Sequence, residues 1–528
     1  MIKILDCTLR DGGYVNNFCF GEANIRNIIR KLSKANIDIV ECGFLKSKEF
    51  DSNKSLFGDI ASVKNAICKK SPNTMYVAMI QYGKISIEEI NNRDKDSIDG
   101  IRLTFHEHEI EGAFVFGEQL KEKGYQVFMQ PVGTTTYSDE ALLCLIKRVN
   151  ELMPFAFYMV DTLGVMHKND VLRMFYLVDN NLNKNIAIGF HPHNNLQLSF
   201  ANAQELMEVN TYRDIIIDSS VYGMGRGAGN LNTELMTQYI NKHIERKYDN
   251  LEILEIIDEY IKPLTITYHW GYDAVYYLAA ITNSHPNYAS FLLNKQTLHV
   301  QDIYSILCCM DEVKRTLYDK EYIQQQYVKY MSHAINDNTS REELARDIGE
   351  KKVLLLAPGK SVQDYYADLK KLVEVEKPYV ISVNHIPDGI NPDLLFMSNI
   401  KRFDKVKAED GHAFAGRKTV IASNINALIS EPVYVINYAS YLCEDQTIVD
   451  NAGLMCINLL KKIGVKEISL AGFDGFGDFN LDGSCADFET IQSNHYQEVN
   501  LAISKELKRL KTQTNIVFVT PSIYEKLM

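Results

Sequence analysis

The sequence predicts an N-terminal (β/α)8 barrel followed by a separate α/β domain. Short apolar runs alternate with segments whose apolar residues recur every three or four positions, as amphipathic helices require. Strands separated by helices pair in parallel through right-handed crossovers. Eight such units within residues 1–250 match a closed barrel in number and length, and an open doubly wound sheet is the alternative. The eight runs are 2–6, 38–44, 75–80, 99–105, 125–130, 155–161, 186–193 and 214–220.

The rest of the chain changes character twice. Residues 251–350 contain long helical stretches and end in a polar, charged segment, so they predict a helical extension and a linker. Apolar runs separated by helical pieces then return over 351–528 and predict a separate α/β domain. These later runs are 353–361, 379–385, 419–424, 467–474 and 515–522.

Composition excludes several classes of protein. The formal charge of −12 over 528 residues disfavours nucleic acid as a partner. No apolar run is long enough to span a membrane, and the first residues do not form a secretory signal. The ten cysteines have neither a framework spacing nor a CxxC pair, which is typical of a reduced, cytoplasmic protein.

Charged residues follow the first predicted strand, in LDCTLRDGG. Active sites of barrels lie at the carboxyl ends of the strands, so Asp11 is expected at the barrel mouth. In the seventh run, GFHPHNN, the side chains of His191 and His193 face the same side of a strand. One carboxylate with two imidazoles suits a divalent ion of the Mg, Mn, Co or Zn range. Without Asp11, packed or surface histidines would be the simpler interpretation.

A glycine-rich stretch, YGMGRGAGN over 222–230, follows the eighth run. Its glycines let the backbone approach a ligand closely, although a flexible turn or a phosphate cradle is also consistent with it. It lacks the strand–GxGxxG–helix context of a dinucleotide site.

Three motifs in this order, DCTLRDGG, GFHPHNNLQLSFAN and GMGRGAGNLNTE, resemble the DRE-TIM metallolyase superfamily over about residues 1–300. That superfamily includes HMG-CoA lyase, isopropylmalate and homocitrate synthases, and 4-hydroxy-2-oxovalerate aldolase. FYMVDTLGVM and GYDAVYY resemble the aldolase branch. The cysteine of the lyases is replaced here by Tyr222 and Gly223, and the GEQ of the synthases by GGY.

The resemblance implies roles for individual residues. A fixed cation, Arg10, would stabilise a developing enolate. Thr162 would hold the carboxylate of a keto acid, and Tyr272 matches an aldolase tyrosine proposed in proton transfer. The implied metal ligands are Asp11, His191, His193 and Asn230, the last as a ligand or as support for one.

One departure concerns the catalytic base. The aldolases carry a histidine shortly after LRDG, and this chain has Tyr14. A tyrosine with an ordinary pKa of about 10 is a poor base near neutrality. His106 and His108, in TFHEHE, are candidates to replace it, and solvated loop histidines are the alternative interpretation.

The expected function is therefore a divalent-metal-dependent aldolase that acts through the enolate of pyruvate or another 2-oxo acid, with an aldehyde as second substrate. The direction of the reaction stays open. An acyl-CoA-dependent synthase or lyase, and a scaffold that has lost its base, are the alternatives. A homodimer is expected by analogy with barrel enzymes of this kind.

The C-terminal domain carries weaker motifs. VLLLAPGKS is not a P-loop, because Leu354 stands where the first glycine is required. ISVNH, DNAGLMCINLLKKIGVKEISLAGFDGF and NHYQEVN resemble the Rossmann-like domain of bacterial CMP-sialyltransferases and related surface-polysaccharide proteins. This resemblance implies a nucleotide or nucleotide sugar, a transferase activity as an alternative function, and a link to surface-polysaccharide sugar biosynthesis. A degenerate assembly domain is the other interpretation, and Asp474 is either a polar site residue or a turn aspartate. The residues implied near a nucleotide are Gly359, Ser361, Asn384 and His495.

Overall fold

A computed structural model describes residues 1–46, 51–295, 297–332, 334–409, 414, 417–425, 433–477 and 496–528. The chain divides into two compact units. The N-terminal unit contains residues 1–290 and 311–318, and the C-terminal unit contains residues 291–310 and 319–528. The helical extension expected over 251–350 is thus shared between the two units.

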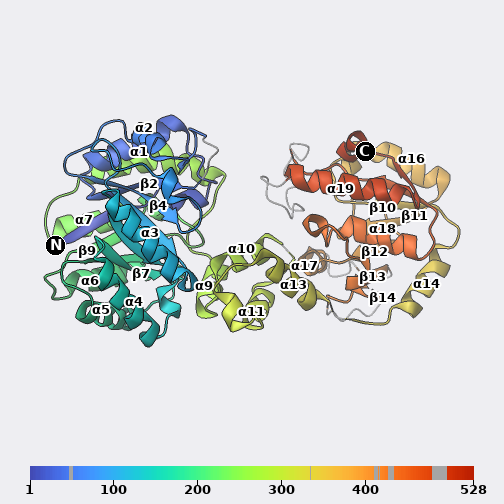
Figure 1. Cartoon of the computed structure of the whole chain (residues 1–528). Coiled ribbons are helices and arrows are strands. Elements are labelled where there is room, and N and C mark those ends of the chain that lie inside the picture. The colour runs from blue at the N-terminus through green and yellow to red at the C-terminus, as the bar shows by residue number, and fades with distance from the viewer. Residues whose placement is uncertain are drawn as a thin grey trace. The chain divides into compact units, whose positions relative to one another are not determined.

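The N-terminal unit is built on a closed parallel barrel, as predicted (Figure 1). All eight predicted strands are confirmed, and β1 pairs with both β9 and β2, which closes the sheet. A two-residue strand that the sequence did not indicate, β3 (Leu56–Phe57), adds to the edge of β2. The barrel strands are β1 (Ile2–Asp6), β2 (Ile39–Leu45), β4 (Met75–Gln81), β5 (Gly100–Phe105), β6 (Gln126–Pro131), β7 (Ala156–Asp161), β8 (Ala187–Pro192) and β9 (Ile215–Ser219).

The barrel core has two layers. Alternate strand residues such as Ile4 and Ile101 pack outward against the surrounding helices. The intervening residues, among them Leu5, Val77 and Phe128, fill the inside. Both faces of the strands are therefore buried, as expected when helices cover a parallel sheet. The helices of this part are α1 (Glu22–Lys34), α2 (Ile60–Ile67), α3 (Ile110–Glu122), α4 (Asp139–Leu152), α5 (Lys168–Asn181), α6 (Ser199–Glu208), α7 (Thr233–His243) and α8 (Asn250–Ile256).

The extension is helical, and none of the helices in the described residues is long and apolar enough to cross a membrane. Asp273 caps the first of its helices by accepting a hydrogen bond from the Val275 N–H. The helices are α9 (Ala274–Ile281), α10 (Pro286–Asn294), α11 (Val300–Cys308), α12 (Glu312–Arg315), α13 (Lys320–Met331) and α14 (Asn338–Ile348).

The C-terminal unit contains an open parallel sheet of order β14-β13-β12-β11-β10-β15-β16. Five of its strands coincide with the predicted apolar runs, whereas β12 and β14 were not predicted. Length does not explain this difference, because β10 and β16 are four residues long as well and were predicted. The strands are β10 (Val353–Leu356), β11 (Tyr379–Val383), β12 (Leu394–Met397), β13 (Lys418–Ala422), β14 (Val433–Ile436), β15 (Glu467–Ala471) and β16 (Asn515–Phe518).

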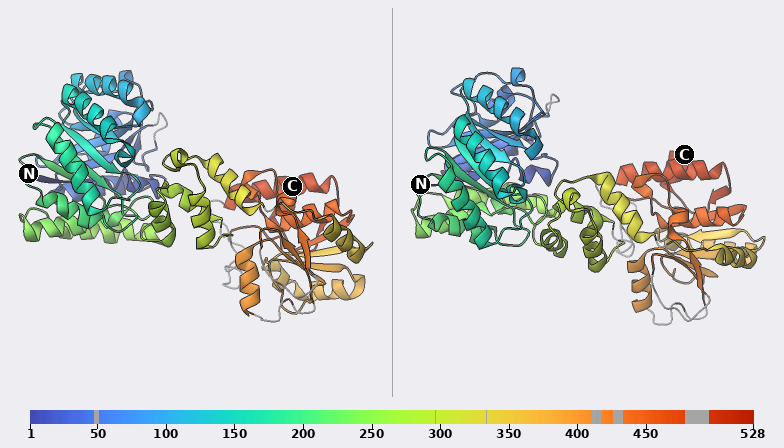
Figure 2. Two further views of the ribbon diagram at one scale, coloured as in Figure 1. Left: turned by 90° about the horizontal axis from the view of Figure 1, so that it is seen from below. Right: turned by 60° about the horizontal axis from the view of Figure 1, so that its bottom comes forward.

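Helices accompany this sheet on both sides (Figure 2). The central strands β10, β11 and β12 are buried along their whole length, so both of their faces are covered. The helices are α15 (Ser361–Asp364), α16 (Tyr366–Glu376), α17 (Ile400–Glu409), α18 (Ala452–Lys462), α19 (Tyr496–Lys511) and α20 (Ile523–Leu527).

Candidate metal centre at the barrel mouth

The first charge after the apolar core of β1 has a structural role. The carboxylate of Asp6 accepts hydrogen bonds from the Thr8 N–H at 3.0 Å and from the Thr233 hydroxyl at 2.7 Å. Burial raises the pKa of Asp6 to about 6. Asp6 thus ties the end of β1 to the start of α7, and this fixes the loop that carries the next two charged residues.

Asp11, His191 and His193 form one cluster. A carboxylate oxygen and a ring nitrogen from each histidine lie within 4.8 Å of one another, and all three residues are buried. Burial by itself would raise the pKa of Asp11, but the positive charge of Arg10 lowers it below its usual range. Burial lowers the pKa of His193 to about 3, so its imidazole is neutral at pH 7. Both groups are therefore in the protonation states that bind a metal ion.

Asn230 completes this donor set. Its Nδ2 donates to the Asp11 Oδ2 at 2.7 Å and to the Met224 carbonyl at 3.1 Å. Its Oδ1 is buried and has no hydrogen-bond partner among the described residues. An unsatisfied buried oxygen beside a carboxylate and two imidazoles fits a divalent cation, and this donor set suits the Mg, Mn, Co or Zn range.

A chain of buried ion pairs orients the metal ligands. Asp218 on β9 contacts the Nδ1 of His191 at 2.8 Å and also pairs with Arg102 on β5. Arg102 in turn donates to Glu41 on β2 at 2.7 Å. With its Nδ1 held by Asp218, His191 presents Nε2 to the cluster, the arrangement that is common behind metal-ligating histidines.

This series of ion pairs continues to the loop after β1, because the Arg10 Nε donates to Glu41 at 2.8 Å. The buried acids Asp11, Glu41 and Asp218 outnumber the two buried arginines by one negative charge. A divalent cation at the cluster would more than offset that negative charge.

This support was not predicted from the sequence. Glu41 lies in IVECGFL, Arg102 in GIRLTF and Asp218 in IIIDS, each a single charge within an apolar strand. A single charge in a strand that is buried on both faces needs a buried partner. That pattern was the available signal, although it does not reveal which charges pair.

Two arginines at the mouth have guanidinium groups that the described residues do not fully pair. The Nη2 of Arg10 is buried and has no partner in the described part of the chain. Arg226, from the glycine-rich stretch, stacks over the ring of Tyr14 at 4.1 Å and forms no ion pair with any described carboxylate. Tyr14, the residue at the position of the family base, therefore supports a cation here.

The glycine-rich stretch packs against the extension. Gly229 has a φ of +84°, and a Cβ there would lie 2.1 Å from the Gly223 carbonyl oxygen. A Cβ on Gly227 would lie 3.2 Å from the Cβ of Pro286, the first residue of α10. These glycines let the stretch fold tightly between the metal ligands and the extension.

The residue before α10, His285, was also missed by sequence analysis. Its Nδ1 accepts a hydrogen bond from the Asn287 N–H at 3.1 Å. Burial lowers the pKa of His285 to about 3, and the positive charge of Arg226 adds to the effect. His285 is thus a neutral imidazole with its proton on Nε2, and the next residue, Pro286, packs against the glycine-rich stretch.

The remaining predicted barrel residues are not members of the Asp11, His191 and His193 cluster. Thr162 follows β7, and its hydroxyl oxygen accepts from the Gly133 N–H at 2.9 Å while its proton stays available. His106 and His108 stack on each other with ring centroids 5.8 Å apart, and burial lowers the pKa of His106. Tyr272 is 65% exposed.

The residues predicted to bind a nucleotide lie in the C-terminal unit. Gly359 and Asn384 line a cavity there. Ser361 donates to Asp474 from its backbone N–H at 2.8 Å and from its hydroxyl. His495 lies outside the described residues.

Comparison with known proteins supports this description of the N-terminal unit. Residues 1–259 match the sequence model of the HMGL-like family. A 4-hydroxy-2-oxovalerate aldolase from Geobacillus genomosp. 3 is 26% identical over 267 residues, which is 50% of this chain and 77% of the relative. An oxaloacetate decarboxylase from Mycobacterium tuberculosis is 27% identical, over 45% of this chain and 70% of the relative.

Among solved structures, one N-terminal domain from Bacteroides vulgatus is 28% identical with a TM-score of 0.49. That protein has been given the provisional name of an aldolase. That match covers 55% of this chain and 96% of the other. With the family match over residues 1–259 and the parallel eight-stranded barrel, the N-terminal domain of this protein is an HMGL-like domain of the DRE-TIM metallolyase type.

Proposed function

We propose that the barrel catalyses the cleavage or formation of a carbon–carbon bond through the enolate of a 2-oxo acid such as pyruvate. The observation that carries this proposal is the cluster of Asp11, His191 and His193 beside Arg10, whose Nη2 has no partner among the described residues. A divalent ion held by this cluster supplies Lewis-acid chemistry to the 2-oxo group of the substrate.

The side chains around the cluster are suited to bind the enolate oxygen and the carboxylate of the substrate. Arg10 places a fixed positive charge where the enolate oxygen becomes negative, and this favours the transition state over the ground state. Arg226 supplies a second cation, suited to the substrate carboxylate, because no described carboxylate neutralises it. The hydroxyl proton of Thr162 is an additional donor for that carboxylate.

His285 fits the role of a neutral donor better than that of a base. The proton of its imidazole is on Nε2, because Nδ1 accepts from Asn287. A base with a pKa of about 3 has little driving force to take a proton at neutral pH. A neutral N–H can still donate to an oxygen of the aldehyde or of the 2-oxo acid.

A second candidate is decarboxylation of a 2-oxo diacid, favoured by the similarity to an oxaloacetate decarboxylase. Loss of CO₂ from such an acid leaves the same enolate, so the same groups would serve. The two reactions differ in what is bound beyond the enolate, which is a second carboxylate in one case and an aldehyde in the other.

Proton NMR of pyruvate in deuterated buffer tests the shared step. We expect the methyl signal to disappear with the full-length protein and Mn²⁺ or Co²⁺, and to persist after EDTA is added. His191→Ala should reduce the exchange to the EDTA rate, because one imidazole ligand is lost. His243→Ala, which removes an exposed histidine at the end of α7, is the matched control and should exchange normally.

Metal-dependent exchange that survives in His191→Ala would place the chemistry elsewhere. Absence of exchange in a metal-loaded wild-type protein would refute enolisation of pyruvate. Oxaloacetate consumption without aldehyde-dependent product would favour the decarboxylase, and carbon–carbon bond formation with an added aldehyde would favour the aldolase.

A further inference from the structure

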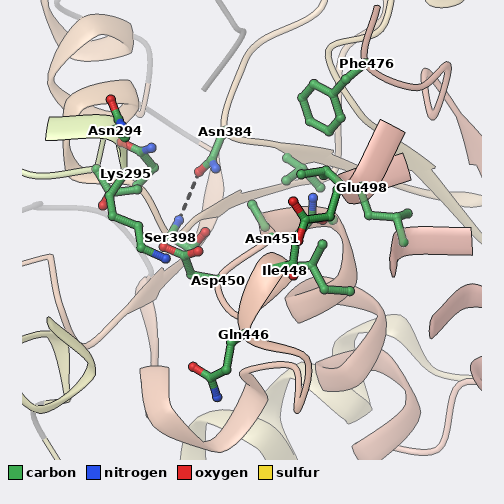
Figure 3. Close-up of a pocket in the computed structure, with 18 of the residues that line it drawn as sticks. Asn294, Lys295, Asn384, Ser398, Gln446, Ile448, Asp450, Asn451, Phe476 and Glu498 are labelled. Carbon is green, nitrogen blue, oxygen red and sulfur yellow. Dashed lines mark hydrogen bonds between the residues drawn. The ribbon is translucent and has the colours of Figure 1, made fainter. Parts of the chain in front are cut away.

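The C-terminal unit contains a cavity of about 840 Å³ that the barrel chemistry does not use (Figure 3). All of its lining residues belong to this unit. Ligand sites for small molecules typically have volumes of about 300–1,000 Å³, so the cavity is large enough for a molecule of several hundred daltons.

The cavity lies where parallel strands end. It is lined by Gly359 after β10, Asn384 after β11, Ser398 after β12 and Asp474 after β15. Strand β10 lies between β11 and β15, so the strand order reverses at this point of the sheet. Loops that leave neighbouring strands in opposite directions open a crevice, and this is where open α/β sheets bind their ligands.

The two loops at the reversal meet closely. A Cβ on Gly359 would lie 2.3 Å from the Gly472 carbonyl oxygen and 2.6 Å from the Asp474 carboxyl carbon. Only glycine allows this approach, and Gly472 also has a φ of +75°, which favours glycine. The floor of the crevice is therefore backbone, which leaves its volume to a ligand.

One lining amide has a buried donor without a partner. Gln324 on α13 is only 8% exposed, and its Nε2 has no partner within the described ranges. A second amide is held in place at the cavity, because the Oδ1 of Asn384 accepts from the Ser398 N–H at 3.0 Å and Asn384 adopts a left-handed φ of +57°. A buried donor without a partner indicates a polar ligand.

Polar and apolar residues share the lining. Figure 3 shows Lys295, Asn384, Ser398 and Asp450 toward one side, and Phe476 together with the charged Glu498 toward the other. The apolar part of the lining includes the aromatic residues Phe291, Tyr438, Phe473, Phe476 and Tyr524. The charged residues are Lys295, Lys320 and Arg402 against Glu321, Asp450, Asp474 and Glu498.

This balance of charge narrows the class of ligand. Three cations against four acids do not suit a free polyanion, but they suit a molecule with one anionic group and several hydroxyls. The N-terminus of α18 adds backbone donors, since Asn451, Ala452 and Gly453 all line the cavity. Aromatic walls suit a planar heterocycle.

We propose that this cavity binds a nucleotide or a nucleotide sugar, the class of molecule that joins a planar base, a ribose diol and an anion. The base packs against the aromatic side that includes Phe476. Carboxylates and amides such as Asp450 and Asn384 bind hydroxyls, and Lys295 with the N-terminus of α18 faces the phosphate. Because α10 and α13 supply lining residues, the extension helices form part of this site.

Calorimetric titration of the full-length protein tests the proposal, with the probes CMP, UMP, AMP, GMP, UDP-glucose, uridine, ribose 5-phosphate and inorganic phosphate. We expect at least one nucleotide to bind, and the nucleoside or the phosphate alone to bind at least about 10-fold more weakly. Gln324→Leu should weaken binding about 10-fold without lowering the melting temperature, because it removes a buried amide that has no partner.

Asn384→Gly is the second variant, since glycine accepts the left-handed φ, and it should also weaken binding. Gln363→Leu, an exposed glutamine on α15 outside the cavity, is the matched control, and His191→Ala should bind nucleotide normally. Failure of every nucleotide to bind would overturn the proposal. Equal binding of inorganic phosphate, or unchanged nucleotide binding in both cavity variants, would overturn it as well. None of these results would bear on the barrel.

Discussion

The barrel mouth and the cavity of the C-terminal unit both lie at the carboxyl ends of parallel strands, yet they arrange their polar groups differently. At the mouth, the strands of the closed barrel bring Glu41, Arg102 and Asp218 together, so their opposite charges pair, and the polar atoms left without partners among the described residues lie within or beside this ion-paired cluster. In the open sheet the strands diverge, and donors such as the Gln324 Nε2 stay unpaired around a large volume. Closure favours a rigid metal centre, and reversal of strand order favours a site shaped for a larger ligand.

The largest expected effect comes from removing the fixed cation of the mouth. Arg10→Gln should slow the methyl-proton exchange of pyruvate by about 10²–10³, the typical loss for one donor to a developing oxyanion. Metal binding should stay or become tighter, because a positive charge beside Asp11 is lost. Exchange kinetics and Mn²⁺ titration measure the two quantities. A loss of Mn²⁺ binding would mean that Arg10 builds the metal site instead, and nucleotide binding in the C-terminal unit should not change.

A smaller effect concerns the cost of burying charge at the mouth. The pKa of Asp6 is about 6 when folded and near 3.8 when unfolded. At a pH below the unfolded pKa, Asp6 is protonated in both the folded and the unfolded state. As the pH rises, the unfolded state loses its proton first, so the free energy of unfolding falls until the pH has passed the folded pKa. Asp6→Asn does not titrate, so relative to wild type it should gain up to about 3 kcal/mol between about pH 4 and about pH 7.

Chemical unfolding at the two pH values checks this sign. Asp214→Asn is a control of opposite sign, because burial of Asp214 is outweighed by its bond to Lys3, which lowers its pKa. The ionised Asp214 stabilises the folded state, and this stabilisation is lost when the pH falls. On acidification, the free energy of unfolding of Asp214→Asn should therefore fall less than that of the wild type. If wild type and Asp6→Asn differed by the same free energy of unfolding at both pH values, the pKa of Asp6 would not be raised by folding.

The next effect tests the ion-pair chain behind the metal ligands. Asp218→Asn should weaken metal binding about 10- to 100-fold, because His191 loses the carboxylate that fixes its ring and its tautomer. Metal titration followed by competition with a chelator gives the affinity. Asp214→Asn, just before the same strand β9, should leave it unchanged. Equal affinities in both variants would mean that Asp218 serves folding alone.

The smallest effect is expected at the contact with the extension. His285→Gln should slow exchange roughly 10-fold, the contribution of one neutral hydrogen bond. With a pKa of about 3, His285 stays neutral between pH 5 and pH 8, so the wild-type rate should show no step near pH 6.5 that depends on it. A pH profile of both proteins is the measurement. A midpoint near 6.5 that vanishes in His285→Gln would instead make His285 a base.

Prediction from the sequence worked best where the signal is local. His191 and His193 alternate along one strand, so the geometry of a strand puts both on the same side. Asp11 follows another strand by five residues, and the position of barrel sites at the carboxyl ends of the strands puts it at the same mouth. The strands β12 and β14 were not predicted, although β10 and β16, which are equally short, were, so a run of four apolar residues is too weak a signal to identify every strand. His106 matched a base only by residue type and position along the chain.

By itself, the sequence predicted the barrel, its eight strands and the three residues of the candidate metal site, because strand alternation, the carboxyl-end position of barrel sites and the family motifs point to them. Only the tertiary structure decided which buried charges pair, that Tyr14 supports Arg226, and that the segment with His285 and Pro286 packs against the glycine-rich stretch. It also decided that helices of the extension complete a cavity in the C-terminal unit. These contacts join residues far apart in the chain, and neither periodicity nor spacing specifies which distant side chains meet.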